Sequence, residues 1–117
     1  MTVNDVFERV TVLLGYSNAD GTHMGLEVIK SRTVGCINQI LSDLSVSLVL
    51  SDLNDEITLD KSGIDAVVYG AAMLLALGVG DAEKNVLFAG LYNIKRSAYK
   101  SLITKKSDVL PSDDGGV

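Results

Sequence analysis

His23 and Cys36 are the side chains best suited to nucleophilic or metal chemistry, and the sequence contains one histidine and one cysteine. A zinc site needs several such ligands at short spacings such as HExxH or CxxC, and neither spacing surrounds these residues. His23 follows Gly21 and Thr22 at an expected helix start, which favours a capping or surface role. Cys36 falls on an apolar helix face, where a thiol usually packs as a small hydrophobic group. A Cys–His pair stays open, because such partners meet in space rather than in sequence.

Two further patterns suggest phosphate or calcium binding. Gly-x-Gly occurs at 78–80, but no expected strand precedes it and no third glycine follows in register, so the dinucleotide-binding pattern is incomplete. Asp52, Asn54 and Glu56 alternate as calcium ligands do, without the glycine and distal glutamate that an EF-hand requires. We therefore expect no catalytic residue, no cofactor and no metal ion.

The composition is typical of one soluble globular domain. Of 117 residues, 47% are hydrophobic and 21% are charged, which argues against a disordered chain. Aromatic residues make up 5% and tryptophan is absent, so aliphatic side chains must build the core. A single cysteine excludes an intrachain disulfide and fits a reducing cytoplasm. Segment 1–9 lacks the apolar region of a signal peptide, and the longest apolar stretch, 64–79, is short for a membrane span and contains Asp65.

Apolar spacing of three and four residues predicts two helices in the first half of the chain. Thr2 and Asp5 form a capping-box pattern at the start of the first helix, and Gly15 is placed to end it. The second helix is expected over about 23–44. In 45–59 apolar and polar residues alternate, which indicates an extended loop or a short β-hairpin.

The third expected helix begins at Asp60, a good N-cap residue, and is apolar on nearly every side between residues 64 and 77. A helix that is apolar all round is buried all round. One small monomer does not readily provide such a core, so this helix suggests further contact with neighbouring copies.

The fourth expected helix begins at Asp81 and runs to about Ile103. Its expected apolar face, which Phe88, Tyr92 and Tyr99 widen, consists of Leu87, Leu91, Ile94, Ala98 and Leu102. We predict a flexible tail at 105–117 after a helical domain at 1–104. The fold class is therefore all-α, a small bundle of about four helices.

Charge is distributed unevenly in this chain, whose formal net charge is −5. Residues 43–83 contain eight acidic side chains and one basic one, whereas residues 84–106 contain six basic side chains and no acidic one. The two segments are either solvated faces, partners within one monomer, or a head-to-tail contact between copies, which generates a ring when the rotation closes. The residues expected at such an interface are Asp52, Asp55, Glu56, Lys95, Arg96 and Lys100. Binding to DNA is a weaker hypothesis because the whole chain is acidic.

One half of the chain carries a more specific pattern. An Ala- and Leu-rich helix at 69–77 is followed by Gly-Asp at 80–81, by Leu-Tyr-Asn-Ile-Lys-Arg at 91–96 and by Asp-Val-Leu-Pro at 108–111. Residues 64–111 thereby resemble the C-terminal half of small phage neck proteins, the head-tail connector (adaptor) family. The first half of the chain agrees with that family in its layout of two helices and an extended loop.

The resemblance implies a structural protein of the virion neck, not an enzyme, that assembles in the bacterial host cytoplasm. It implies a homo-oligomeric ring, dodecameric when assembled, that lies under the portal and extends the DNA channel. The implied partners are the portal protein and the next neck or tail protein, with non-specific contact to channel DNA and no membrane. Val109, Leu110 and Pro111 are expected to become ordered on the portal or on an adjacent subunit.

Two alternatives stay open. The first is another phage neck or tail assembly factor, such as a tail terminator or completion protein. The second is a small DNA-binding regulatory module that uses the last helix, whose bases are Lys95, Arg96, Lys100, Lys105 and Lys106.

Overall fold

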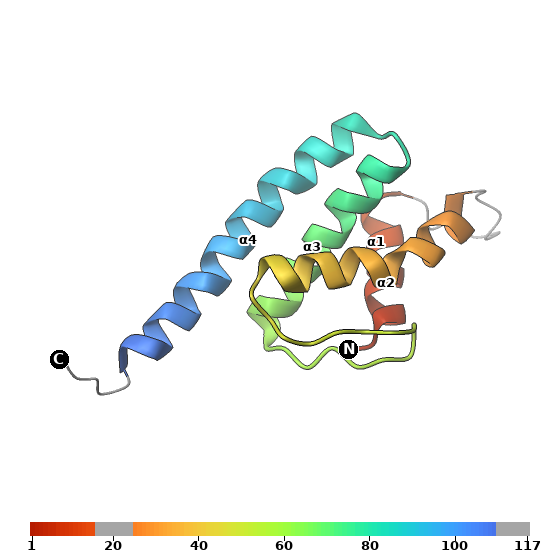
Figure 1. Cartoon of the computed structure of the whole chain (residues 1–117). Helices are drawn as coiled ribbons and strands as arrows, with labels where there is room; N and C mark the ends of the chain where they lie inside the picture. The colour runs from red at the N-terminus through yellow and green to blue at the C-terminus, as the bar shows by residue number, and fades with distance from the viewer. Residues whose placement is uncertain (16–24, 110–117) are drawn as a thin grey trace.

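The computed structural model describes the backbone of residues 1–15 and 25–109, and the side chains of 1–15 and 30–103. These residues form four α-helices and no strand, which confirms the predicted all-α bundle (Figure 1). The helices are α1 (Val3–Leu13), α2 (Gly25–Asp43), α3 (Lys61–Gly78) and α4 (Ala82–Val109).

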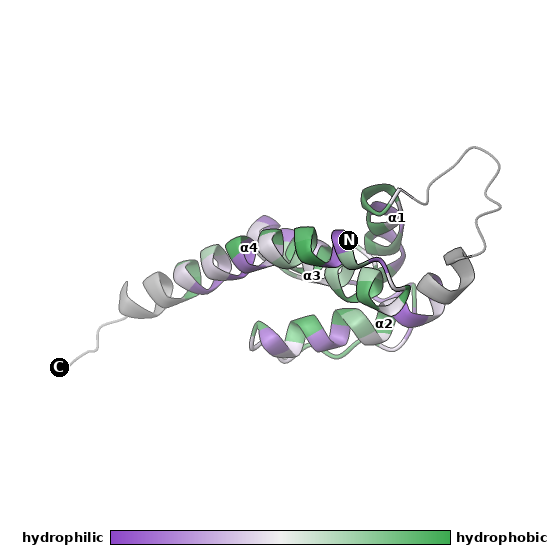
Figure 2. Ribbon diagram, turned by 90° about the horizontal axis from the view of Figure 1, so that it is seen from above, coloured by the Kyte–Doolittle hydropathy of each residue, from purple (hydrophilic) through white to green (hydrophobic). Residues whose placement is uncertain are grey.

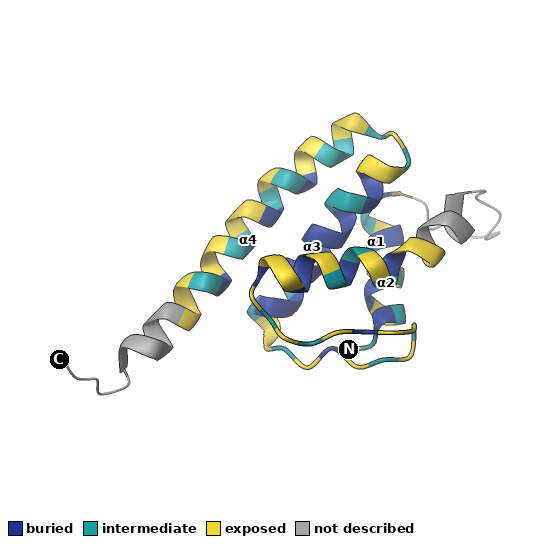
Figure 3. Cartoon of the chain, in the orientation of Figure 1, coloured by how far each residue is buried: buried dark blue, intermediate teal, exposed yellow. Residues whose placement is uncertain are grey.

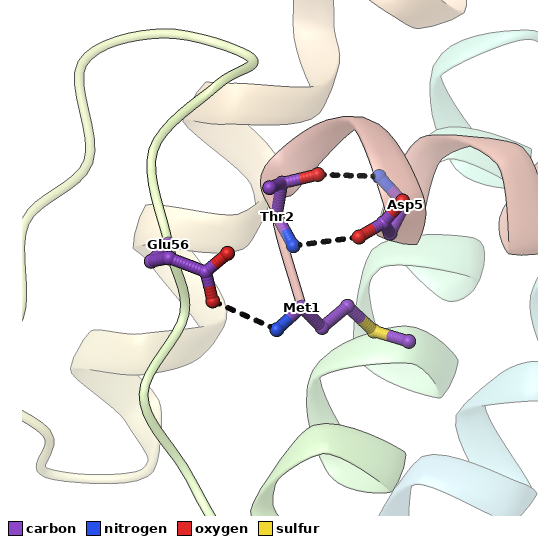
Figure 4. Close-up of polar contacts among 4 residues, drawn as sticks. All are labelled: Met1, Thr2, Asp5 and Glu56. Atoms are coloured by element: carbon purple, nitrogen blue, oxygen red, sulfur yellow. Dashed lines mark hydrogen bonds and ion pairs between the residues drawn. The ribbon is translucent and has the colours of Figure 1, made fainter.

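The predicted capping box starts α1. The Thr2 hydroxyl accepts a hydrogen bond from the Asp5 backbone N–H at 3.1 Å, and the Asp5 carboxylate accepts one from the Thr2 N–H at 2.9 Å (Figure 4). The pair satisfies two of the backbone donors that a helix start leaves free. At the other end Gly15 has a φ of +76°, a left-handed conformation that suits glycine, so the predicted end of this helix is also confirmed.

Helix α3 lies at the centre of the bundle, and α1, α2 and α4 all pack against it (Figures 1 and 3). Asp60 caps α3 as predicted, accepting from the Gly63 N–H at 2.9 Å. Among the large apolar side chains of α3 only Leu77 is exposed, at 63%. The monomer itself therefore covers most of the large apolar side chains of α3, and the expected contact with neighbouring copies stays a prediction. Among the described helices α3 is the one whose length and composition would suit a membrane span, yet here it is the core helix.

Two of the core contacts depend on glycine in α3. A Cβ atom at Gly70 would lie 2.7 Å from Ile40 Cδ1 in α2, and one at Gly63 would lie 3.0 Å from Tyr99 Cε1 in α4. The missing side chains let α2 and α4 approach the central helix closely.

Segment 45–60 contains neither helix nor strand and turns at 52–54, and no hairpin is formed among the described residues. It pairs instead with the chain start, since the Val3 N–H donates to the Asp55 carbonyl at 3.0 Å and the Ile57 N–H donates to the Met1 carbonyl at 2.8 Å. The Asn38 side chain accepts from the Leu50 N–H at 2.8 Å and donates to the Leu50 carbonyl at 2.9 Å. The amide side chain thus makes the two backbone hydrogen bonds that a neighbouring β-strand would otherwise make.

Helix α4 corrects two predictions. It ends at Val109 rather than near Ile103, because no residue before Pro111 interrupts the helix and the position before a proline disfavours helical backbone. The first part of the predicted tail is therefore helical, and residues 110–117 lie outside the described residues. The packed face also differs, since the aromatic residues are buried while Leu87 and Ile94 of the predicted apolar face are exposed.

Candidate interaction surfaces

The candidate nucleophiles and metal ligands do not come together as a reactive site in the described part of the chain. Burial raises the pKa of the half-buried Cys36 thiol, and Arg32 only partly offsets this, so the sulfur stays protonated at neutral pH. His23 lies outside the described residues. No cluster of three or more His, Cys, Asp or Glu residues that suits a metal ion occurs among the described residues.

The Gly-x-Gly pattern ends a helix instead of holding phosphate. Gly80 has a φ of +79°, and the Arg32 guanidinium donates to the Gly78 carbonyl at 3.1 Å. The arginine thereby satisfies one of the carbonyl groups that a helix end leaves free. These glycines close the α3–α4 turn.

We define residues Asp52–Glu56 as the acidic turn. Its carboxylates make hydrogen bonds or an ion pair within the monomer. The Asp55 carboxylate accepts from the N–H groups of Ser51 at 2.6 Å and Asp52 at 3.1 Å, and these bonds lower its pKa. Glu56 pairs with the Met1 α-amino group at 2.9 Å (Figure 4). The turn is therefore held together by hydrogen bonds to its own backbone. Asp52 and Glu56 still expose their side chains to a partner.

One basic residue of α4, Arg96, makes an ion pair within the monomer. Arg96 pairs with Asp43 at the end of α2, with Nε and Oδ2 2.8 Å apart, and the Tyr92 hydroxyl donates to the same oxygen at 2.5 Å. The bond from Tyr92 is the main cause that lowers the pKa of Asp43, and Arg96 adds to it, whereas burial opposes it. Burial and Asp43 raise the pKa of Tyr92. This cluster ties α2 to α4, so part of the predicted charge complementarity acts within one monomer.

Lys95 and Lys100 also lie on α4, where both are half-buried. The backbone bonds from the chain start hold the acidic turn beside α1, on the edge of the molecule opposite α4 (Figure 1). The structure therefore does not bring the predicted acidic and basic interface residues together in one copy. Val109 is the last residue of α4, while Leu110 and Pro111 lie outside the described residues.

Two surface grooves occur near these features. One of about 210 Å³ between α1 and α3 is lined by Arg9, Val12, Leu13, Val68 and Tyr69. Another of about 530 Å³ between α2 and the acidic turn is lined by Lys30, Ser31, Val34, Asp52, Leu53 and Asn54. Neither lining contains a paired nucleophile and base.

The sequence did not reveal the polar contacts of Asp43, Tyr92 and Asn38 that join separate segments of the chain. The charge pattern located the correct two segments for Asp43 and Arg96, but only the crossing of α2 and α4 selects that pair. Comparison of the chain with protein-family models, with curated protein sequences and with solved structures finds no match.

Proposed function

We propose that this chain is a structural subunit of a phage neck, a head-tail connector that forms a ring under the portal. The observation that carries the proposal is the resemblance of residues 64–111 to that family, and the described part of this stretch, 64–109, forms one helical hairpin, α3–α4. Its motif residues have defined contacts. Asp81 caps α4 by accepting from the Lys84 N–H at 3.1 Å, and Tyr92 and Arg96 hold Asp43.

The distribution of charge supports assembly into a ring. Exposed acids of the acidic turn lie on one edge of the molecule, and α4 with Lys95 and Lys100 forms the opposite edge (Figure 1). A head-to-tail contact joins two different patches on neighbouring copies, so opposite charges on opposite edges favour this arrangement. The ring would extend the DNA channel, bind the portal on one side and present the next neck or tail protein with a platform on the other.

Sedimentation with the portal protein from the same genome tests the proposal. We expect the chain to move with the portal and to saturate at a fixed number of copies for each portal. Failure to co-sediment at concentrations well above micromolar would contradict the connector role. Deleting residues 107–117 tests the tail, because unchanged attachment of the shortened chain would remove the tail from the portal contact.

A DNA-binding module is the second candidate, favoured by six bases and no acid in residues 84–106. Such a module would bind duplex DNA with an affinity that falls steeply as salt increases, because counterions are released from the phosphates. A connector is expected to bind free DNA weakly. Titration of labelled duplex at two salt concentrations separates the candidates, and tight salt-sensitive binding would favour the module.

A further inference from the structure

Helix α4 has two faces of different character. Its inner face buries Phe88, Tyr92 and Tyr99, which are at most 7% exposed. The opposite side is solvent-exposed along the helix (Figure 3), and we call it the outer face of α4: it consists of Val86, Leu87, Gly90, Ile94, Ser97, Ala98 and Ser101. None of these seven residues is charged, although the exposed Glu83 lies on the same side of the helix at its first turn. At 100° per residue, Lys95 and Lys100 border this face on its two sides.

This outer face is unusual for a solvated helix, which normally turns charged side chains towards water. Val86, Leu87 and Ile94 expose 70%, 57% and 64% of their surface. A Cβ atom at Gly90 would meet nothing within 4 Å, so a partner has free access to the backbone between the large side chains. A row of apolar side chains without charge indicates a surface that another molecule covers.

The opposite edge of the same molecule has complementary properties. On α1, Asp5, Glu8 and Val12 follow one another at helical spacing and all three are exposed, Val12 by 65%. The acidic turn lies beside them, because the N–H groups of Val3 and Asn4 donate to its carbonyl groups. The α1 edge therefore offers an apolar side chain bordered by two acids and the acidic turn, with the exposed Arg9 also beside Val12. Helix α4 begins near the end of α1, where Lys84 Nζ donates to the Leu14 carbonyl at 2.6 Å, and then runs away from α1 (Figures 1 and 2).

We propose that the outer face of α4 in one copy packs against the α1 edge of the next copy in the ring. This inference rests on the connector function proposed above. Leu87 and Ile94 would meet Val12, while Lys95 and Lys100 face the acids of the neighbouring α1 edge. A symmetric α4–α4 contact is less favourable, because it would bring the lysines of both copies to the borders of one seam, where like charges repel.

Three variants that each add one carboxylate test this contact. Ile94→Glu alters the outer face of α4, and Val12→Glu alters the α1 edge. Gln39→Glu is the control, because residue 39 is exposed on α2 and belongs to neither surface. All three sites are exposed, so circular dichroism and the melting temperature should stay close to those of the unaltered chain. Copies bound per portal and ring density in electron micrographs are the measurements.

We expect Ile94→Glu and Val12→Glu each to weaken ring formation by about tenfold or more, since each carboxylate would be buried in the contact. Gln39→Glu should assemble like the unaltered chain. Ring formation by both interface variants would overturn the inference. So would loss of the ring with Ile94→Glu alone, which would assign the outer face to the portal or to a second α4. Failure of the unaltered chain to bind the portal would instead overturn the proposed function itself.

Discussion

The close approach of α2 and α3 predicts the effect of one methyl group. In Gly70→Ala the added Cβ would lie 2.7 Å from Ile40 Cδ1, 2.8 Å from Cγ1 and 3.0 Å from Cγ2. Ile40 is only 3% exposed, and two of these three atoms are not at the flexible end of its side chain. The isoleucine must therefore shift inside a packed core, or the two helices must separate.

Two opposing effects determine the size of the change. Overpacking of a core costs about 1–3 kcal/mol. Replacing glycine by alanine within a helix stabilises it by about 1 kcal/mol. The net effect of Gly70→Ala is thus a loss of about 0–2 kcal/mol in the free energy of unfolding.

Gly35→Ala is the matched control, because Gly35 is also inside a helix but its Cβ would meet nothing within 4 Å. It should gain about 1 kcal/mol from helix propensity alone. The two variants should differ by about 1–3 kcal/mol, or about 4–12 °C in melting temperature for a domain of this size. Urea unfolding of both variants measures the difference. Equal stabilisation by the two alanines would refute the α2–α3 contact described here.

Two further substitutions test contacts that hold the interaction surfaces. Asp43→Asn should cost about 1 kcal/mol at neutral pH, because the pair with Arg96 is partly exposed. The folded pKa of Asp43 is lowered, so its stabilisation is present above the unfolded pKa of about 3.9 and is lost as pH falls through the folded value. Urea unfolding should therefore show the largest difference between variant and parent at neutral pH and a smaller one as the pH falls below about 3.9, and a constant difference would contradict this. Asn38→Ala should cost about 1–3 kcal/mol, since it leaves both backbone groups of buried Leu50 unpaired. Hydrogen exchange should then accelerate in segment 45–51, and unchanged protection there would argue against the Asn38 contact.

Local signals predicted the helix starts well. Thr2 and Asp5 form their capping box, and Asp60 caps α3, because these bonds involve residues three positions apart. The apolar pattern of 64–77 also identified the central helix correctly. The pattern could not show how much of this helix the monomer itself covers, because that depends on how α1, α2 and α4 pack against it.

The predictions that failed depend on tertiary contacts. In α4 the apolar residues cover more than one side, so periodicity cannot select the side that packs against α3. The aromatic side forms that contact, with Tyr69 and Phe88 stacked at 6.2 Å between ring centroids, and leaves Ile94 exposed. Likewise, the segment charges indicated complementarity, yet the pair of Asp43 with Arg96 follows from the crossing of two helices far apart in sequence.

Cryo-electron microscopy of the portal protein mixed with an excess of the full chain tests the proposed ring most directly. We predict an added ring of helical density on the tail-facing side, with α4 of each copy beside α1 of the next. A bare portal at saturating chain concentration would contradict the connector role.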